Sequence, residues 1–202
     1  VSWSRGLGDV YKRQDEHFCG GYREYWTGVG GCDGGTGPIE IHFIDEVNPG
    51  YFWIFPVSEN VVNVGVGMVI SEQRKQKGMR SSLKKMQKWI TSESPRFSHR
   101  FKNAQMVEGT GKGWQLPFGS PRMKPASFQP RRGAMAGAMC VGDSASLVDP
   151  FTGEGIGNAL VSAKLTAKIF DREKHANGFP ADQAAHYMDC LLYTSPSPRD
   201  QL

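Results

Sequence analysis

Alternating apolar and polar residues predict an antiparallel sheet in the first half of the chain. The alternation covers residues 39–46, 51–56 and 61–70, and turn signals at Asn48-Pro49-Gly50 and Asn60 separate the three segments. Strict alternation is typical of a half-buried strand, and links this short favour antiparallel pairing. We therefore expect a meander with one covered face and one face open to another partner.

Apolar residues at three- and four-residue steps predict helices. Met79, Leu83, Met86 and Ile90 form one apolar stripe on a helix expected over residues 71–92. A second helix is expected from Ile156 to Phe170, and a third begins near Pro180 and breaks off at Cys190. Residues 15–27 are expected to form the end of a strand or a connector. Two further strands are expected over residues 104–107 and 114–120.

The other side of the 71–92 helix is basic, with Arg74, Lys75, Lys77, Arg80, Lys84, Lys85 and Lys88. Such a helix can lie on an anionic membrane, or it can be a solvated helix packed on the sheet, which is the interpretation we favour. The net charge of the whole chain is +4, too small to indicate a nucleic-acid partner.

The composition is typical of a globular protein. The cysteines indicate a reducing compartment, so we expect a cytoplasmic location. The chain has 202 residues, of which 39% are hydrophobic, and no apolar run reaches transmembrane length. Its four cysteines lack C-x-x-C spacing, its five histidines lack ligand spacing, and no Gly-x-Ser-x-Gly motif occurs. The sequence therefore predicts no metal site, and it assigns no catalytic residue.

A strand, a glycine-rich loop and a helix start are expected between residues 136 and 170. The apolar run 136–141 predicts a buried strand, followed by Gly142-Asp143, Asp149-Pro150 and Gly153-x-Gly155-x-Gly157. Glycines expose bare backbone, and the first N–H groups of a helix favour a polar ligand. Glycines alone would fit an ordinary connection, but together with Asp143 and Asp149 they favour a cofactor site.

This stretch resembles the second flavin-binding motif of FAD-dependent oxidoreductases of the p-hydroxybenzoate hydroxylase fold, and most of all that of the geranylgeranyl reductase family. The resemblance implies an FAD cofactor. It also implies a contact of Asp143 with the ribityl and phosphate-linked part, and a helix amino end directed at the isoalloxazine. The implied cofactor-binding residues are Gly142, Asp143, Asp149, Pro150, Gly153, Gly155, Ile156, Gly157 and Asn158.

Tyr51-x-Trp53-x-Phe55-Pro56 is similar to a pattern that lines the lipid cavity of geranylgeranyl reductases, and Gly113-Trp114-x-Leu116-Pro117 resembles another segment near that cavity. The resemblance implies a substrate cavity formed by Tyr51, Trp53, Phe55, Pro56, Leu116 and Pro117. From the pattern alone, the aromatic residues fit the core of a sheet equally well. Gly65 and Gly67 are expected to leave room for a substrate or for a neighbouring aromatic ring.

The expected fold is mixed α+β and α/β. An antiparallel substrate-domain sheet over residues 15–134 precedes the C-terminal half of an FAD-binding Rossmann-like domain over residues 135–190. Residues 1–14 and 191–202 resemble translated sequencing-adapter sequence and are expected to be foreign or disordered tails. Because no G-x-G-x-x-G lies within a βαβ unit, we expect an internal fragment that lacks the N-terminal βαβ unit.

The resemblance implies a reductase that hydrogenates geranylgeranyl-type isoprenoid double bonds by hydride transfer from reduced flavin. Its partners would be a hydrophobic isoprenoid substrate and an electron donor such as NADPH or ferredoxin, with no nucleic acid and with a peripheral membrane contact left open. The fragment itself is expected to be inactive and to bind FAD weakly. The alternatives are an FAD-dependent aromatic monooxygenase or halogenase of the same fold, and a non-catalytic lipid-binding module.

Overall fold

The computed structural model describes residues 18–32, 37–118, 133–149 and 151–194, with side chains described as far as Leu191. The chain divides into two compact units, Val1–Gln115 and Leu116–Leu202. The assignment of residues 15–134 to substrate binding and 135–190 to cofactor binding stays a prediction. Pro150, the segment 1–14 and the end of the second expected tail, 195–202, lie outside the described residues.

The first unit is built on an antiparallel sheet with the strand order β2-β3-β4-β1-β5, in which β6 also pairs with β1. The strands are β1 (Phe18–Thr27), β2 (Glu40–His42), β3 (Gly50–Ser58), β4 (Val61–Val69), β5 (Gln105–Met106) and β6 (Lys112–Pro117). The predicted meander of β2, β3 and β4 is confirmed.

Two strands differ from the prediction. Residues 18–27, expected as the end of a strand or a connector, form a ten-residue strand in the interior of the sheet. The strand predicted over residues 39–46 has only three residues, because the chain turns where the Val47 N–H donates to the Ile44 carbonyl oxygen at 3.0 Å. The Val47 side chain is fully buried although the residue lies in this turn and not in a longer strand.

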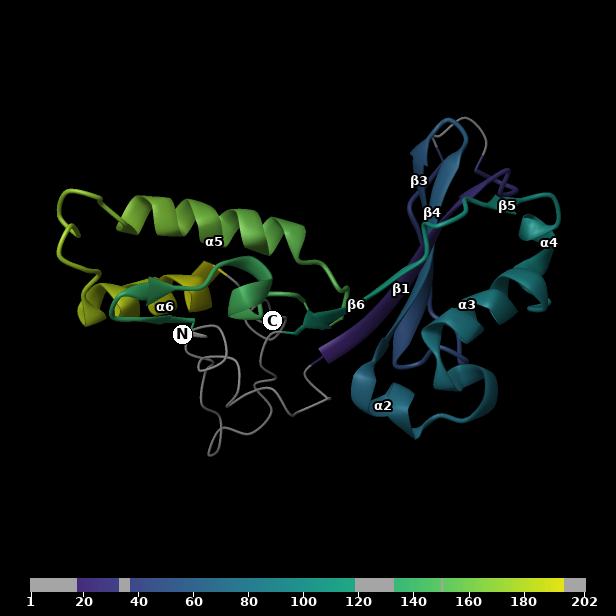
Figure 1. The fold of residues 1–202 in the computed structure, drawn as a ribbon, viewed down its shortest axis with the longest axis horizontal. Coiled ribbons are helices and arrows are strands. Elements are labelled where there is room, and N and C mark those ends of the chain that lie inside the picture. The colour runs from purple at the N-terminus through teal and green to yellow at the C-terminus, as the bar shows by residue number, and fades with distance from the viewer. Residues whose placement is uncertain (1–17, 33–36, 119–132, 150, 195–202) are drawn as a thin grey trace. The chain divides into compact units, whose positions relative to one another are not determined.

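A layer of short helices covers one face of this sheet (Figure 1). It contains α2 (Ile70–Lys75), the 3-10 helix η3 (Gly78–Ser81), α3 (Leu83–Ser92) and α4 (Ser98–Phe101). The single helix predicted over residues 71–92 is wrong, because Gln76 is extended and Gly78 has a φ of +63°, which no continuous helix allows. The predicted apolar stripe survives in α3, whose Met86 and Ile90 are fully buried against the sheet.

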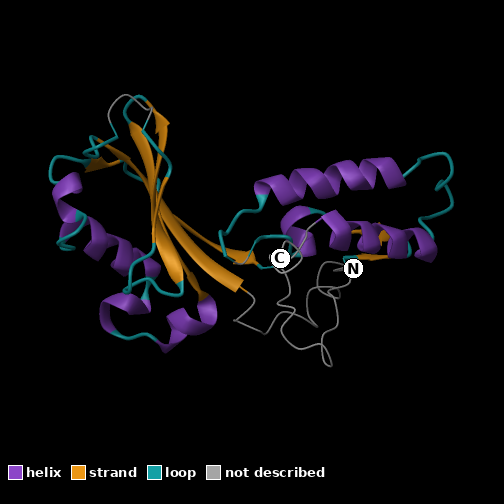
Figure 2. Cartoon of the chain, turned by 180° about the vertical axis from the view of Figure 1, so that it is seen from behind, coloured by secondary structure: helices purple, strands orange, loops and turns teal. Residues whose placement is uncertain are grey.

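The second unit consists of a small hairpin, a 3-10 turn and two helices (Figure 2). These are β7 (Ala134–Met135), β8 (Ala138–Met139), the 3-10 helix η4 (Gly142–Ala145), α5 (Ile156–Ile169) and α6 (Ala181–Thr194). The predicted helix over 156–170 is confirmed. The predicted buried strand over 136–141 is wrong, since Gly137, at φ +81°, reverses the chain into the hairpin and leaves Val141 exposed.

Helix α6 is fastened to the hairpin by a fully buried tyrosine. The Tyr187 hydroxyl donates to the Cys140 carbonyl oxygen at 2.7 Å. The helix continues to Thr194, beyond the expected break at Cys190, and its Leu191 is buried. No helix in the described part of the chain combines the length and apolarity needed to cross a membrane.

Candidate functional site

One face of the sheet is not covered by the helices of the first unit, and this uncovered face carries the aromatic residues of β3. Along this strand Phe52 and Ile54 are fully buried under the helical layer. Because successive side chains of a strand point to opposite faces, Tyr51, Trp53 and Phe55 lie on the other face, and each is half-buried. The prediction that these three rings share one face is confirmed, and this face lies opposite the described helices of the first unit.

The rings form a continuous ladder. Tyr51 and Trp53 have ring centroids 5.8 Å apart at an interplanar angle of 61°, and Trp53 and Phe55 stack at 5.9 Å and 27°. Phe43, just after β2, extends the ladder with an edge contact to Tyr51 at 5.9 Å. Such pairs add about 0.5–1.5 kcal/mol each beyond area burial, so the ladder is a firm apolar surface.

Gly65 makes room for Trp53. A Cβ placed on Gly65 would overlap the Trp53 indole, so the ring lies directly over the backbone of β4. The indole Nε1 donates to Asn63 Oδ1 at 3.0 Å, which fixes the ring in the plane of this face. Of the two occupants expected above the glycines, the structure supports the neighbouring aromatic ring.

The other expected cavity residues lie at strand ends. Pro56 follows the ladder on β3, is half-buried and pairs with Val62. Leu116 and Pro117 are half-buried at the end of β6, where the second unit begins. Their part in a common cavity stays a prediction.

Sequence analysis missed a buried carboxylate on the helix-covered face. Glu24 on β1 accepts hydrogen bonds from the Tyr22 hydroxyl at 2.9 Å, from Trp26 Nε1 at 3.1 Å and from Gln87 Nε2 of α3 at 3.0 Å. Gln87 is fully buried and also donates to the Val64 carbonyl oxygen at 3.2 Å. The spacing Tyr22-x-Glu24-x-Trp26 places all three side chains on one face of β1 and was the only signal that could have revealed it.

This network predicts alkaline sensitivity. Burial, together with the hydrogen bond and the negative charge of the adjacent Glu24, raises the pKa of Tyr22 to about 12. Tyrosine in an unfolded chain ionises near pH 10, so the stabilising contribution of protonated Tyr22 is complete below about pH 10 and is lost as the pH rises towards 12. Urea unfolding followed by fluorescence at pH 9 and pH 11.5 should show this loss, and Tyr22→Phe should reduce the difference. An unchanged difference in Tyr22→Phe would contradict the assignment.

In the second unit, the expected cofactor loop wraps the amino end of α5. Gly155 precedes the helix, and a Cβ there would come within 3.3 Å of Asp143 Oδ1 and 3.2 Å of Val148. The exposed Asp143 carboxylate thus lies beside the bare backbone of Gly155. Both residues belong to the expected cofactor site although they are twelve positions apart in the sequence, and their contact with a cofactor stays a prediction.

Several of the expected cofactor residues shape the loop itself. Asp149 Oδ1 accepts from the Phe151 and Thr152 N–H groups at 3.0 and 2.7 Å, and Gly153 follows at φ +71°. The Asn158 side-chain amide donates to the Leu147 carbonyl oxygen at 2.8 Å. These contacts hold the turn against α5.

The helix start has a carboxylate cap. Glu154 Oε1 accepts from the Gly157 N–H at 2.6 Å, and Ile156 beside it is exposed. A carboxylate in the first turn of a helix is favoured by the helix dipole. The carboxylate of Glu154 therefore occupies part of the amino end that a cofactor would approach, and it was absent from the expected site.

Ser162 is a second residue that sequence analysis missed. Its hydroxyl is fully buried on α5, accepts from the Gly142 N–H at 3.0 Å and donates to the Ala159 carbonyl oxygen at 2.8 Å. A Cβ on Gly142 would come within 3.0 Å of the Ala159 side chain, so the loop and the helix are in close contact here. One hydroxyl thus fixes the expected glycine-aspartate turn to α5.

We expect Ser162→Ala to loosen this turn. The substitution leaves the buried Gly142 N–H without its partner, which costs about 1–3 kcal/mol. Hydrogen–deuterium exchange should accelerate in the 142–145 turn and in the first half of α5. Ser144→Ala is the matched control, because the Ser144 hydroxyl bonds the Val141 backbone but is exposed, so water can replace it. Equal exchange in the two variants would refute the buried role of Ser162.

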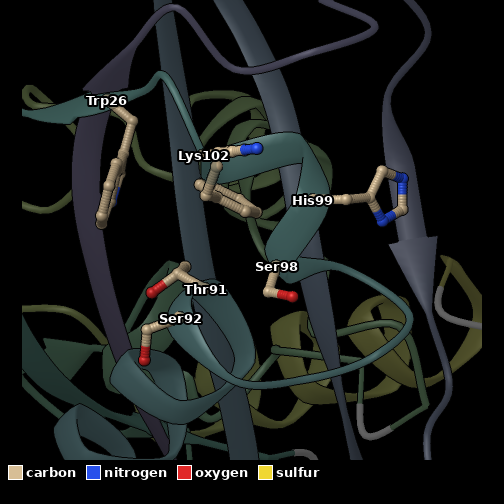
Figure 3. Close-up of a pocket in the computed structure, with 7 residues that line it drawn as sticks. Trp26, Thr91, Ser92, Ser98, His99 and Lys102 are labelled. Atoms are coloured by element: carbon tan, nitrogen blue, oxygen red, sulfur yellow. The ribbon is translucent and has the colours of Figure 1, made fainter.

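A surface pocket of about 380 Å³ lies in the helical layer, away from the aromatic ladder (Figure 3). The Thr91 and Ser92 hydroxyls in its wall donate to the carbonyl oxygens of Gln87 and Lys88. The remaining polar side chains of the lining are Ser98, His99 and Lys102. None of the expected cavity or cofactor residues lines it. We assign no part of the candidate site to this pocket.

Comparison with known proteins now identifies the sheet unit. Residues 21–110 match the model of the geranylgeranyl reductase catalytic domain, and this match contains the whole aromatic ladder. Over this segment the chain is similar to the catalytic domain of the geranylgeranyl reductase family. The match confirms the resemblance inferred from the Tyr51–Pro56 pattern.

Individual relatives agree with the family match. The chain is 29% identical over 135 residues to a digeranylgeranylglycerophospholipid reductase of Methanoculleus marisnigri, covering 66% of this chain and 29% of the relative. It is 30% identical over 158 residues to a menaquinone reductase of Mycobacterium tuberculosis, covering 75% and 34%. The chain thus spans about a third of the length of these curated relatives.

A solved structure shows the same fold. A geranylgeranyl bacteriochlorophyll reductase-like protein from Thermoplasma acidophilum matches with a TM-score of 0.69 and 23% identity, over 90% of this chain and 40% of that one. The predicted mixed fold, with an antiparallel sheet followed by a largely helical segment, is confirmed.

Proposed function

We propose that this chain forms the substrate-binding sheet and part of the flavin site of a reductase that hydrogenates isoprenoid double bonds. The observation that carries the proposal is the ladder of Tyr51, Trp53 and Phe55, which lies on the uncovered sheet face within the family match. Two relatives are named as reductases of digeranylgeranylglycerophospholipid and of menaquinone. Both of these molecules carry isoprenoid chains. A row of stacked rings suits such a chain, since both are apolar and extended.

The residues around α5 fit an FAD cofactor. Gly155 leaves its backbone open on the side of Asp143, where even a methyl group would be in tight contact. In the complete site the Asp143 carboxylate would accept hydrogen bonds from the ribityl hydroxyls, and the amino end of α5 would face the isoalloxazine. Gly142, Asp149, Gly153, Ile156, Gly157 and Asn158 would supply backbone contacts or hold the turn. When reduced, FAD supplies the hydride of the reaction.

The chain's own contribution to catalysis would be positioning and exclusion of water. The aromatic ladder would hold the isoprenoid chain extended, with Pro56, Leu116 and Pro117 completing the apolar wall. Ser162 and Asn158 would keep the cofactor turn in place through the contacts described above. The electron donor would be NADPH or ferredoxin.

The helical layer supports a peripheral membrane contact. Ten of the chain's 24 lysine and arginine residues, but only two of its 20 aspartate and glutamate residues, lie between Ile70 and Asn103. This segment carries a net charge of +8, whereas the rest of the chain sums to −4. Each basic residue near an anionic bilayer contributes about 1 kcal/mol, so a cytoplasmic enzyme of this kind could remain at the membrane that holds its substrate.

The deciding experiment is an anaerobic assay of the full-length polypeptide that carries this chain, with FAD, dithionite and a geranylgeranyl lipid. We expect products heavier by two hydrogens for each double bond reduced. Turnover that requires oxygen and yields a hydroxylated or halogenated product would instead establish the monooxygenase or halogenase alternative. Isoprenoid binding without bound flavin or turnover would establish a lipid-binding module.

A further inference from the structure

The uncovered sheet face carries one arginine in register with the aromatic ladder. Cross-strand pairing aligns Ile41 with Trp53, Trp53 with Gly65, and Gly65 with Arg23. These four residues therefore form one row across β2, β3, β4 and β1, apolar at one end and cationic at the other. Neighbouring strands lie about 4.8 Å apart, so Arg23 is two strands from Trp53, about 10 Å in backbone distance.

The Arg23 guanidinium is held in place but is not neutralised. Its Nη1 donates to the Thr110 carbonyl oxygen at 2.9 Å, and its Cζ lies 4.5 Å from the Tyr25 ring centroid. The Thr110 hydroxyl in turn accepts from the Tyr25 N–H at 3.0 Å, so the neighbouring loop is fixed to β1. Among the described residues no carboxylate forms an ion pair with Arg23.

A second arginine of the same unit shows the contrast. Arg100 is also half-buried, and Glu40 binds it with two hydrogen bonds of 2.6 and 2.7 Å. Arg100 lies in α4, on the covered side of the sheet, where its charge is compensated within the protein. Of these two half-buried guanidinium groups, only the one on the uncovered face has unused donors and no anion.

We propose that Arg23 binds the anionic head of an isoprenoid ligand whose chain lies on the aromatic ladder. This assignment rests on the proposed function, and it adds the ligand class and the residue that selects it: a prenyl phosphate or phospholipid rather than a neutral prenyl compound. The planar guanidinium matches two oxygens of a phosphate, and its stacking on Tyr25 holds it in one orientation before a ligand arrives.

Binding to the full 202-residue chain tests the proposal. Trp53 lies within the ladder, so a ligand that binds to this face should change the tryptophan fluorescence. The probes are geranylgeranyl phosphate, geranylgeraniol and inorganic phosphate, each below its aggregation concentration. We expect the prenyl phosphate to bind at least about tenfold more tightly than the alcohol, because a charge-assisted hydrogen bond to a phosphate is stronger than a hydrogen bond to a neutral hydroxyl.

Three variants separate a head-group role from a structural one. Arg23→Gln should abolish the preference for the phosphate while changing the affinity for geranylgeraniol less than twofold, and Arg23→Lys should retain part of the preference. Lys88→Gln removes an exposed charge from the covered side and should change neither affinity. Circular dichroism and the unfolding midpoint show whether each variant is folded.

The outcomes distinguish this inference from the proposed function. If wild type binds both prenyl probes and Arg23→Gln binds them with unchanged affinities, the role of Arg23 is refuted and the isoprenoid assignment stands. Equal loss of both affinities in Arg23→Gln would show a structural role and also refute it. If inorganic phosphate alone competes as well as the prenyl phosphate, the site is a simple anion site. If wild type binds neither prenyl probe, both the proposed function and the inference fail.

Discussion

Gly65→Ala is expected to displace the Trp53 indole and destabilise the first unit. The added Cβ would overlap the ring, which cannot move away without losing its hydrogen bond to Asn63. Overpacking of this kind costs about 1–3 kcal/mol, and the lost hydrogen bond adds about 1 kcal/mol. A urea titration followed by tryptophan fluorescence measures the first cost, and near-ultraviolet circular dichroism measures the loss of ring order.

Gly67→Ala is the matched control two residues along the same strand. Its Cβ would lie 3.4 Å from Cys19 Sγ and 3.6 Å from Trp53, which are ordinary contacts. Replacing a strand glycine by alanine removes backbone entropy from the unfolded chain, so this variant should be as stable as wild type or gain up to about 1 kcal/mol. The interpretation of the ladder would be wrong if Gly65→Ala matched Gly67→Ala in stability and in its near-ultraviolet spectrum.

The Gly65→Ala substitution also tests the proposed site. Because the indole would leave the row that joins Ile41 to Arg23, affinity for a prenyl chain should fall at least about tenfold, which corresponds to about 1.4 kcal/mol. Gly67→Ala should bind as wild type does. A loss of affinity at both glycines would indicate that the ligand lies closer to β4 than the ladder suggests.

Strands β3 and β4 could be predicted because each depends on the alternation of apolar and polar residues within its own short segment. Period-two alternation identified β3 and β4, and the same period placed the three rings of β3 on one face before any pairing was known. The pattern could not show that β1 lies inside the sheet, because Gly20-Gly21 interrupts its apolar run and only the pairing with β4 gives it a neighbour. Nor could the pattern show the break between α2 and α3, which depends on the positive φ of Gly78.

The candidate site was predictable only where a motif was continuous in sequence. Gly142-Asp143 and the glycines before α5 were found together because they occupy one short stretch. Ser162 follows Gly142 by twenty residues, and Gln87 follows Glu24 by sixty-three, so only the fold brings these pairs into contact. Single polar residues within apolar runs give no signal of their own, and their partners become evident only when burial and hydrogen bonds are known.

Glu24→Leu is expected to be the most destabilising substitution on the covered face of the sheet. It would leave the Tyr22 hydroxyl and Trp26 Nε1 without an acceptor and remove one of two acceptors from Gln87 Nε2. An unpaired donor costs about 1–3 kcal/mol when it is buried, and the Tyr22 and Trp26 donors are half-buried, so a loss of about 2–4 kcal/mol is expected. The urea midpoint from tryptophan fluorescence should fall accordingly, and a variant within about 1 kcal/mol of wild type would contradict the role of this carboxylate.

The substitution Gln87→Leu tests the same hydrogen bond from the side of α3. Gln87 Oε1 is buried and has no hydrogen-bond partner among the described residues, so removing the amide also removes one unsatisfied atom. The double variant Glu24→Leu/Gln87→Leu should therefore be less destabilised than the sum of the two single variants, by about 1–2 kcal/mol. Simple additivity would mean that β1 and α3 are held together by apolar packing alone, and that the Glu24–Gln87 hydrogen bond contributes nothing to the position of the strand that carries Arg23.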